Sequence, residues 1–453
     1  MANADTTAAT AAEDRPDLTY PAEDWAGFIR NHLGPSLMWA LLGIGGSHIV
    51  LAPTLGGMYG IFGVWVVALI FLAKYGGWEL GIRYNYGIGR NPVEGYGDLP
   101  GPAHWGQVFT MVVYLVGWTV ILASVGFSAA TFLAALVPSV TPIQLYVGLI
   151  ALAVALTLFS QYSWIETLMK GFVLVLGGFV LLGVFVSPPS PSLVAETAVS
   201  VPNFSSPVFL GLFAALAGYA PTGLSTTVTI GSWSMAKEEG ARALRDKNYD
   251  PTDEQFREYI GSWMRTGIRD FRVAFGFSFV LIVSMILLAT AVLYPTPPQD
   301  QNMALAIGSI LQEGFGDWTF YVVVAGAFAA LFSTVITVTD GAARVNADTL
   351  PLVLEREMNT ERLRRGFILL MGVASIVPVL VIGQLPITLM IFSAALMAIL
   401  QVFFYFANYY IVRKHLPAAF QPGTARKVYY AVTMVLVAGF GVMGGLSRLG
   451  LVG

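Results

Sequence analysis

The chain has 453 residues, of which 56% are hydrophobic and only 11% are charged, and its mean hydropathy is +0.69. Soluble domains carry about 25% charged residues, so this composition indicates a polytopic membrane protein. The formal net charge of −3 is too small to indicate a nucleic-acid partner, and the absence of cysteine excludes disulfides, thiolate metal sites and cysteine catalysis.

The first 28 residues are polar and rich in Ala, Thr and Asp. They lack the charged-then-apolar pattern of a signal peptide. We therefore expect residues 1–28 to form a disordered cytoplasmic tail. Residues 29–453 are expected to form a single transmembrane domain.

Eleven later segments are apolar and near the length of about 20 residues that a membrane-spanning helix needs. They are expected at 34–57, 61–83, 107–136, 142–159, 167–187, 207–233, 271–294, 319–341, 364–382, 386–411 and 428–447. Lysine and arginine concentrate in the connections that are cytoplasmic when the N-terminus is inside. The pattern thus predicts a cell-membrane protein with a cytoplasmic N-terminus and, after eleven spans, a C-terminus outside.

Spans 1 and 6 carry helix-breaking residues at their centres. Span 1 reads "ALLGIGGSHIVLAPTLGG" and contains Gly45-Gly46-Ser47-His48, whereas span 6 reads "ALAGYAPTGLSTTVTIGS" and contains Ala220-Pro221-Thr222-Gly223. A shift of about 175 residues aligns the two stretches. It pairs Gly43 with Gly218, Ile49 with Leu224 and Gly56 with Gly231. The alignment indicates an internal repeat.

The shift maps spans 1–5 (about 34–187) onto spans 6–10 (about 207–411) and leaves span 11 (428–447) as an addition. Because five is odd, the second copy has inverted topology, as in many transporters. Unwound backbone survives in a membrane only beside protein or a polar cavity, where its free carbonyl and N–H groups bind substrate. We therefore expect an all-α transporter with spans 1 and 6 broken and a substrate site between the breaks.

The predicted substrate-binding residues belong to the two breaks and their polar neighbours. They are Gly45, Gly46, Ser47, His48, Tyr219, Ala220, Pro221, Thr222, Gly223, Thr226 and Thr227. His48 is the one ionisable side chain in either break, and it either serves the substrate or a proton, or caps a half-helix as a neutral imidazole. Thr226 and Thr227 either line a polar cavity or bond back to helix carbonyls.

Two further groups of residues leave alternatives open. Lys74 lies well inside span 2, where its ammonium either reaches the inner membrane interface or acts as a fixed cation in place of a coupling ion. Trp78, Trp118 and Tyr114 are interpreted as packing or lipid-facing residues rather than substrate contacts.

Three other segments resemble a known family. They are "ELGIRYNYGIGRNPVEGY" (79–96), "SWIETLMKGFVLVLGG" (163–178) and "AALFSTVITVTDGAARVNAD" (329–348). In this order, together with the two breaks, they resemble the Nramp divalent-metal transporters. The resemblance implies the LeuT-type 5+5 inverted-repeat fold and secondary transport of a divalent ion such as Mn²⁺ by alternating access.

The resemblance also implies which positions would hold the metal. The family carries Asp-Pro-Gly-Asn in span 1 and Met-Pro-His-Asn in span 6, and its Asp, Asn and Met ligand positions fall on Gly45, His48 and Ala220. Only Pro221 keeps its identity. The acidic span 3 residues that the family uses for proton movement fall on Ile121 and Ser124. The scaffold therefore resembles Nramp without its metal and proton chemistry.

The residues present favour a different cargo from the family's. Hard cations want carboxylate or carbonyl oxygens, and a bare divalent ion at mid-membrane needs a compensating anion. A hydrated ion or a small organic solute fits this residue set better, and a channel is a further alternative. We find no nucleophile–base pair, metal triad or phosphate loop, so we expect no enzyme and no cofactor. The expected partners are a small ion or solute and the lipid bilayer, with the protein a monomer.

Overall fold

The computed structural model describes residues 18–159, 171, 177–178, 180–245, 247, 249–300, 302–312 and 316–448, and within these ranges every regular element is helical. The first half contains α2 (Trp25–Asn31), α3 (Pro35–Gly43), η1 (Ile44–Leu51), α4 (Ala52–Tyr59), α5 (Phe62–Ile88), α6 (Pro92–Gly95), η2 (Tyr96–Asp98), α7 (Trp105–Val112), η3 (Val113–Gly117), α8 (Trp118–Leu136), α9 (Pro142–Phe159) and α11 (Pro191–Ala198). The second half contains α12 (Pro207–Tyr219), α13 (Thr226–Ala236), η4 (Arg242–Leu244), α14 (Glu254–Leu293), α15 (Met303–Gly308), η5 (Ser309–Leu311), α17 (Trp318–Val353), α18 (Thr360–Ala374), α19 (Ile376–Ile382), α20 (Pro386–His415), η6 (Ala418–Phe420) and α21 (Thr424–Arg448).

Nine helical stretches in the described part of the chain are long and apolar enough to cross a membrane. They are Pro35–Tyr59, Phe62–Ile88, Trp105–Leu136, Pro142–Phe159, Glu254–Leu293, Trp318–Val353, Thr360–Ile382, Pro386–His415 and Thr424–Gly445. These stretches coincide with predicted spans 1–4 and 7–11. Predicted span 6 is divided into α12 and α13, and about half of predicted span 5 (167–187) lies outside the described residues.

The prediction of a disordered tail over residues 1–28 is wrong for its described part. Asp24 caps α2 by accepting a hydrogen bond from the backbone N–H of Gly27 at 2.9 Å. Phe28 is fully buried, and the guanidinium of Arg269 on α14 lies 5.1 Å from the ring centroid of Trp25. Aromatic packing and cation–π attraction order this segment, which its polar average composition concealed. Residues 1–17 lie outside the described ranges.

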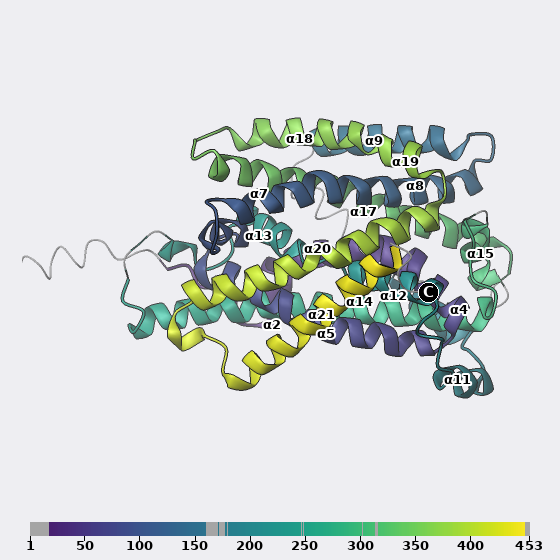
Figure 1. Ribbon diagram of the computed structural model, residues 1–453, viewed down its shortest axis with the longest axis horizontal. Coiled ribbons are helices and arrows are strands. Elements are labelled where there is room, and N and C mark those ends of the chain that lie inside the picture. The colour runs from purple at the N-terminus through teal and green to yellow at the C-terminus, as the bar shows by residue number, and fades with distance from the viewer. Residues whose placement is uncertain are drawn as a thin grey trace, which may run out of the picture.

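Span 1 occupies the centre of the bundle. Most long helices run along the long axis in Figure 1, whereas α20 and α21 cross it obliquely, and α9 and α18 lie together at one edge. Only 28% of the residues of α9 are buried. In the most apolar 18-residue stretch of Pro35–Tyr59, by contrast, 94% of the residues are buried. The central segment η1 packs against α12, α14, α17 and α20. The centre of span 1 is thus enclosed by protein rather than lipid.

Two glycines paired by the internal repeat allow backbones to meet. A Cβ atom on Gly43 would lie 2.1 Å from the carbonyl oxygen of Pro221, and one on Gly218 would lie 1.8 Å from that of Ala394. Neither approach leaves room for any side chain. These contacts join span 1 to span 6, and span 6 to span 10.

Candidate functional site

The break in span 6 is present where the sequence predicts it. Helix α12 ends at Tyr219, α13 begins at Thr226, and the residues between them are extended or in turns. Pro221 lacks an N–H group and disfavours helix in the residue before it. Carbonyl groups at the end of α12 are consequently left without helical partners.

Span 1 departs from α-helix at the predicted place but remains helical, which corrects the expectation that its backbone is unwound there. Ile44–Leu51 forms a π-helix, and the N–H of Ala52 reaches the carbonyl of Ser47. The carbonyl oxygen of Gly43 accepts a hydrogen bond from Ser47 Oγ at 2.6 Å and lies 2.9 Å from His48 Nδ1. Because no proline occupies the motif, the helix widens instead of stopping.

A small cavity lies between the π-helix and the span 6 break. Its volume is about 30 Å³, enough for one or two water-sized particles. Its lining residues are Leu42, Gly43, Gly46, Ser47, Trp118, Ile121, Val125, Tyr219, Thr222, Gly223, Ser225, Thr226, Thr334 and Met397. Hydroxyl, aromatic and apolar groups make up this lining, and it contains no carboxylate.

The predicted site residues divide into two groups. The cavity is lined by Gly46, Ser47, Tyr219, Thr222, Gly223 and Thr226, whereas Gly45, His48, Ala220, Pro221 and Thr227 lie outside its lining. The imidazole of His48 is directed towards α14, with Nε2 2.9 Å from the carbonyl oxygen of Ser278. His48 therefore links span 1 to span 7. Thr227 faces another helix and accepts a hydrogen bond from Asn408 Nδ2 of α20 at 3.1 Å.

The space at the family's aspartate position is filled. A Cβ atom on Gly45 would lie 2.2 Å from Thr334 Oγ1 and 2.8 Å from Thr334 Cβ, so the threonine of α17 occupies the place an aspartate side chain would take. At the span 3 position, Ser124 belongs to a hydroxyl cluster. Tyr219 Oη donates to Ser393 Oγ at 2.7 Å, and Ser393 Oγ donates to Ser124 Oγ at 2.9 Å.

Lys74 does not reach the inner interface, which corrects that alternative. Its side chain is fully buried, and Nζ donates to the carbonyl oxygens of Ala217 at 2.7 Å and Ala220 at 2.9 Å and to that of Thr222. The carbonyl oxygen of Gly218 lies 3.4 Å away. The ammonium thus sits on the carbonyls that the span 6 break exposes.

Aromatic residues that the sequence interpretation assigned to packing or lipid hold the break in place. Trp78 Nε1 donates to Thr226 Oγ1 at 3.1 Å, and Tyr114 Oη donates to the carbonyl of Ser225 at 2.6 Å. Trp39 Nε1, which the sequence did not single out, donates to Thr222 Oγ1 at 2.6 Å. The signal available was that buried Trp and Tyr need hydrogen-bond partners, and the break offers acceptors.

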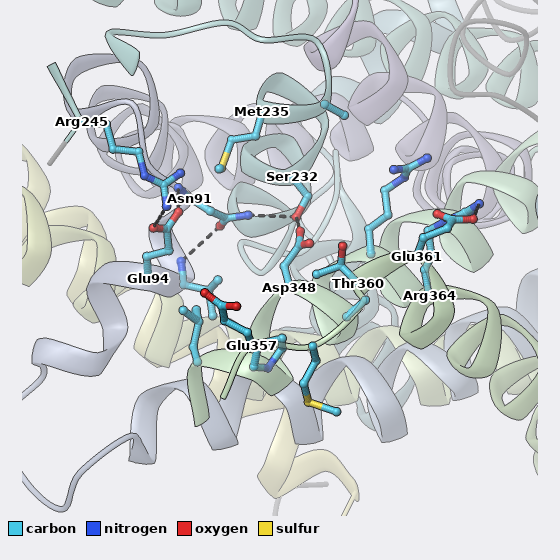
Figure 2. Close-up of a pocket in the computed structure, with 17 residues that line it drawn as sticks. Asn91, Glu94, Ser232, Met235, Arg245, Asp348, Glu357, Thr360, Glu361 and Arg364 are labelled. Atoms are coloured by element: carbon cyan, nitrogen blue, oxygen red, sulfur yellow. Dashed lines mark hydrogen bonds and ion pairs between the residues drawn. The ribbon is translucent and has the colours of Figure 1, made fainter. Parts of the chain in front are cut away.

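A larger cavity of about 550 Å³ opens at the far end of α13, on the face predicted to be cytoplasmic. Figure 2 shows Asn91, Ser232 and Asp348 in a hydrogen-bonded row, with Asn91 Nδ2 donating to Ser232 Oγ at 2.9 Å and Ser232 Oγ donating to Asp348 Oδ2 at 2.8 Å. Arg245 pairs with Glu94 at 2.8 Å on the neighbouring wall. This cavity is charged, unlike the central one.

Comparison with known proteins identifies the family. The profile described as "Natural resistance-associated macrophage protein-like" (Nramp) matches residues 59–447. The chain belongs to the Nramp family. The match begins after the π-helix, so the altered span 1 motif of this Nramp chain lies outside it. An uncharacterized protein of Pasteurella multocida is 23% identical over 346 residues, which are 72% of each chain.

Solved transporters share the fold of this Nramp chain. A manganese transporter of Eremococcus coleocola matches with a TM-score of 0.67 and 14% identity, over 95% of this chain and 89% of that one. MhsT in complex with L-phenylalanine matches with a TM-score of 0.56 and 11% identity, over 91% and 98%. Mhp1, a nucleobase-cation-symport-1 family transporter, matches at 0.55 and 15%, over 96% and 93%. The predicted LeuT-type fold of a multi-pass membrane transporter is thereby confirmed.

Proposed function

We propose that this Nramp-family protein is a secondary transporter that carries its substrate by alternating access through the cavity between η1 and the span 6 break. The support is the position of that cavity between two interrupted spans of an inverted repeat. The cavity volume of about 30 Å³ leaves room for only one or two water-sized molecules. Binding of a larger substrate therefore requires spans 1 and 6 to move relative to their neighbours.

A row of hydroxyl side chains begins at Ser225, the N-cap of α13, and continues along α13 from this cavity towards the larger one. Ser225 lines the central cavity, Ser232 lines the larger cavity, and Thr229 lies between them on the same helix face. Tyr114 Oη contacts Thr229 Oγ1 at 2.7 Å, so hydroxyls continue along the row. Separation of α13 from η3 and α8 would join the two cavities.

We further propose that the cargo is a small uncharged polar solute rather than a divalent metal ion. Two observations carry this proposal: Thr334, which lines the cavity, fills the space beside Gly45, and the lining of the cavity contains no carboxylate. The described residues contain no group of three or more His, Cys, Asp or Glu side chains placed to hold a metal. Hydroxyls and indoles suit hydrogen bonding to a neutral molecule, whereas they leave a divalent charge uncompensated.

The test is transport and binding by purified protein in liposomes. We expect no Mn²⁺ uptake above protein-free liposomes and no saturable Mn²⁺ heat signal. We expect counterflow of a neutral solute, selected from a thermal-shift panel, and its loss in Thr226→Val. The double variant Gly45→Asp/Thr334→Ala places a carboxylate in the vacated space and is expected to gain Mn²⁺ binding. Thr334→Ala alone is the matched control and is expected to gain none.

A divalent cation is the second candidate, because the family match covers residues 59–447 and the Eremococcus coleocola protein of the same fold is a manganese transporter. Saturable Mn²⁺ uptake by the unmodified protein that disappears in Thr226→Val would establish this candidate and overturn the neutral cargo. Uptake at rates far above transporter turnover would instead indicate a channel.

A further inference from the structure

The side-chain ammonium group of Lys74 is surrounded by backbone carbonyl oxygens. We define the carbonyl cage as the carbonyl oxygens of Ala217, Gly218, Ala220 and Thr222, all of which lie within 3.4 Å of Lys74 Nζ. All four groups accept hydrogen bonds and none donates. An ammonium offers three N–H donors, whereas a neutral amine offers two and presents a lone pair to an oxygen. The cage therefore matches the protonated side chain.

The span 6 break creates this cage. Ala217 and Gly218 lie in the last turn of α12, where helix carbonyls lack partners and the helix dipole is negative. The extended residues after α12 turn the carbonyls of Ala220 and Thr222 to the same point. Gln401 Nε2 also donates to the carbonyl of Ala217 at 3.1 Å, and the Trp78 ring centroid lies 5.1 Å from Lys74 Nζ.

A cluster of neutral oxygens around one positive charge is the coordination that a small monovalent cation requires. We propose that the carbonyl cage is a monovalent-cation site whose permanent occupant is the Lys74 ammonium. The protein therefore binds no inorganic cation at the break and needs none to hold span 6 in its interrupted form. This inference goes beyond the proposed function, because it assigns a tethered cation to the place where a transported or coupling ion would sit.

The experiment removes the occupant and offers a soluble replacement. Lys74→Ala deletes three methylene groups and the amine, which together correspond to n-propylammonium. We expect the melting temperature of the purified variant to fall by roughly 5 °C or more, because buried carbonyls lose their charged donor. Addition of n-propylammonium is expected to restore at least half of that fall. Neutral n-propanol and propyltrimethylammonium, which has no N–H, are expected to restore little.

Two control variants separate charge from volume. Lys74→Met keeps the side-chain bulk without the charge, and it is expected to remain destabilised and unresponsive to n-propylammonium. Lys414→Ala removes an exposed lysine paired with Asp98 at 2.9 Å and is expected to melt as the unmodified protein does. Equal rescue by n-propanol, or full stability of Lys74→Met, would overturn the proposal.

A measurement on the unmodified protein covers the case in which the Lys74 variants do not fold. Replacement of Na⁺ by K⁺ or choline at constant ionic strength is expected to leave its melting temperature unchanged, because the site is already occupied. Saturable stabilisation by Na⁺ or K⁺ that disappears when Thr222→Pro distorts the cage would contradict the inference. Each readout is stability rather than flux, so the result stands whether or not a neutral solute proves to be the cargo.

Discussion

The centres of spans 1 and 6 are equivalent in the internal repeat, yet the backbone carbonyls at the two centres have different kinds of partner. In span 1 the helix continues as the π-helix Ile44–Leu51, and the side chains of Ser47 and His48 in the same segment contact the carbonyl of Gly43. In span 6 the helix stops at Tyr219, and a lysine from another span covers the freed carbonyls. The carbonyl at the centre of span 1 is contacted by residues close to it in the sequence, whereas the carbonyls at the span 6 break are contacted by a residue of another helix.

Proline accounts for the difference. Pro221 has no N–H to donate to a helical hydrogen bond, which favours an interruption there. The corresponding position in span 1 is Gly46, which keeps its N–H group and tolerates a change of helix width. With glycine rather than proline at this position, span 1 continues through its centre as a π-helix. The variants below test that comparison, in decreasing order of expected effect.

Gly46→Pro should abolish the distinction between the two spans. The change removes an N–H group inside a helix and places a ring where a Cβ atom would already lie 2.6 Å from Met390 Sδ. We expect the free energy of unfolding in mixed micelles to fall by about 3 kcal/mol or more. Gly46→Ala, which adds only the methyl group beside a flexible methionine, should cost about 1 kcal/mol. Similar losses in both variants would show that volume, not backbone bonding, governs this position.

Gly43→Ala should separate span 1 from the span 6 break. Its Cβ atom would lie 2.1 Å from a backbone oxygen of Pro221, so one of the two segments must shift. We expect a loss of about 2 kcal/mol in unfolding free energy. Gly148→Ala on α9 is the matched control, because a Cβ there meets nothing within 4 Å. If thermal unfolding finds the two variants alike, the close contact between span 1 and the break does not support the fold.

Thr226→Val should weaken the indole contacts that hold the break. Its Oγ1 accepts hydrogen bonds from Trp39 at 3.1 Å and Trp78 at 3.1 Å, so the buried indole of Trp78 would lose its acceptor. We expect a loss of about 1.5 kcal/mol and a shift in tryptophan fluorescence. Thr131→Val on α8 removes only a bond to its own helix at 3.0 Å and should change neither reading. Unaltered fluorescence in Thr226→Val would contradict the assignment.

Ser47→Ala should have the smallest effect. The carbonyl of Gly43 would lose the 2.6 Å hydrogen bond from Ser47 Oγ but would retain His48 Nδ1 at 2.9 Å. We expect a loss of about 0.5 kcal/mol by denaturant titration, because the imidazole of His48 still lies against this carbonyl. A loss as large as that of Gly43→Ala would mean that His48 does not share in closing the π-helix.

The sequence by itself determined the features that depend on local composition. Hydropathy located the spans, the shifted alignment of the two glycine-containing stretches located both interruptions, and Pro221 determined that span 6 must stop. The order of three quoted segments was enough to indicate the Nramp family, which the match over residues 59–447 shows. The orientation of the termini, the repeat boundaries and the monomeric state stay predictions.

Only the tertiary structure decided what surrounds each interruption. Lys74 meets the carbonyl of Ala217, which lies 143 residues further along the chain, so no local pattern could choose between the membrane interface and the carbonyl cage. The side chain of Thr334 fills the space beside Gly45, and the carbonyl of Ser278 lies against the imidazole of His48. Both partners are distant in the sequence, so no local pattern could identify them. The spacing of residues along one helix predicts on which face of that helix a polar group lies. Packing between helices decides which partner it meets, because a buried group must take whatever acceptor the neighbouring helix presents.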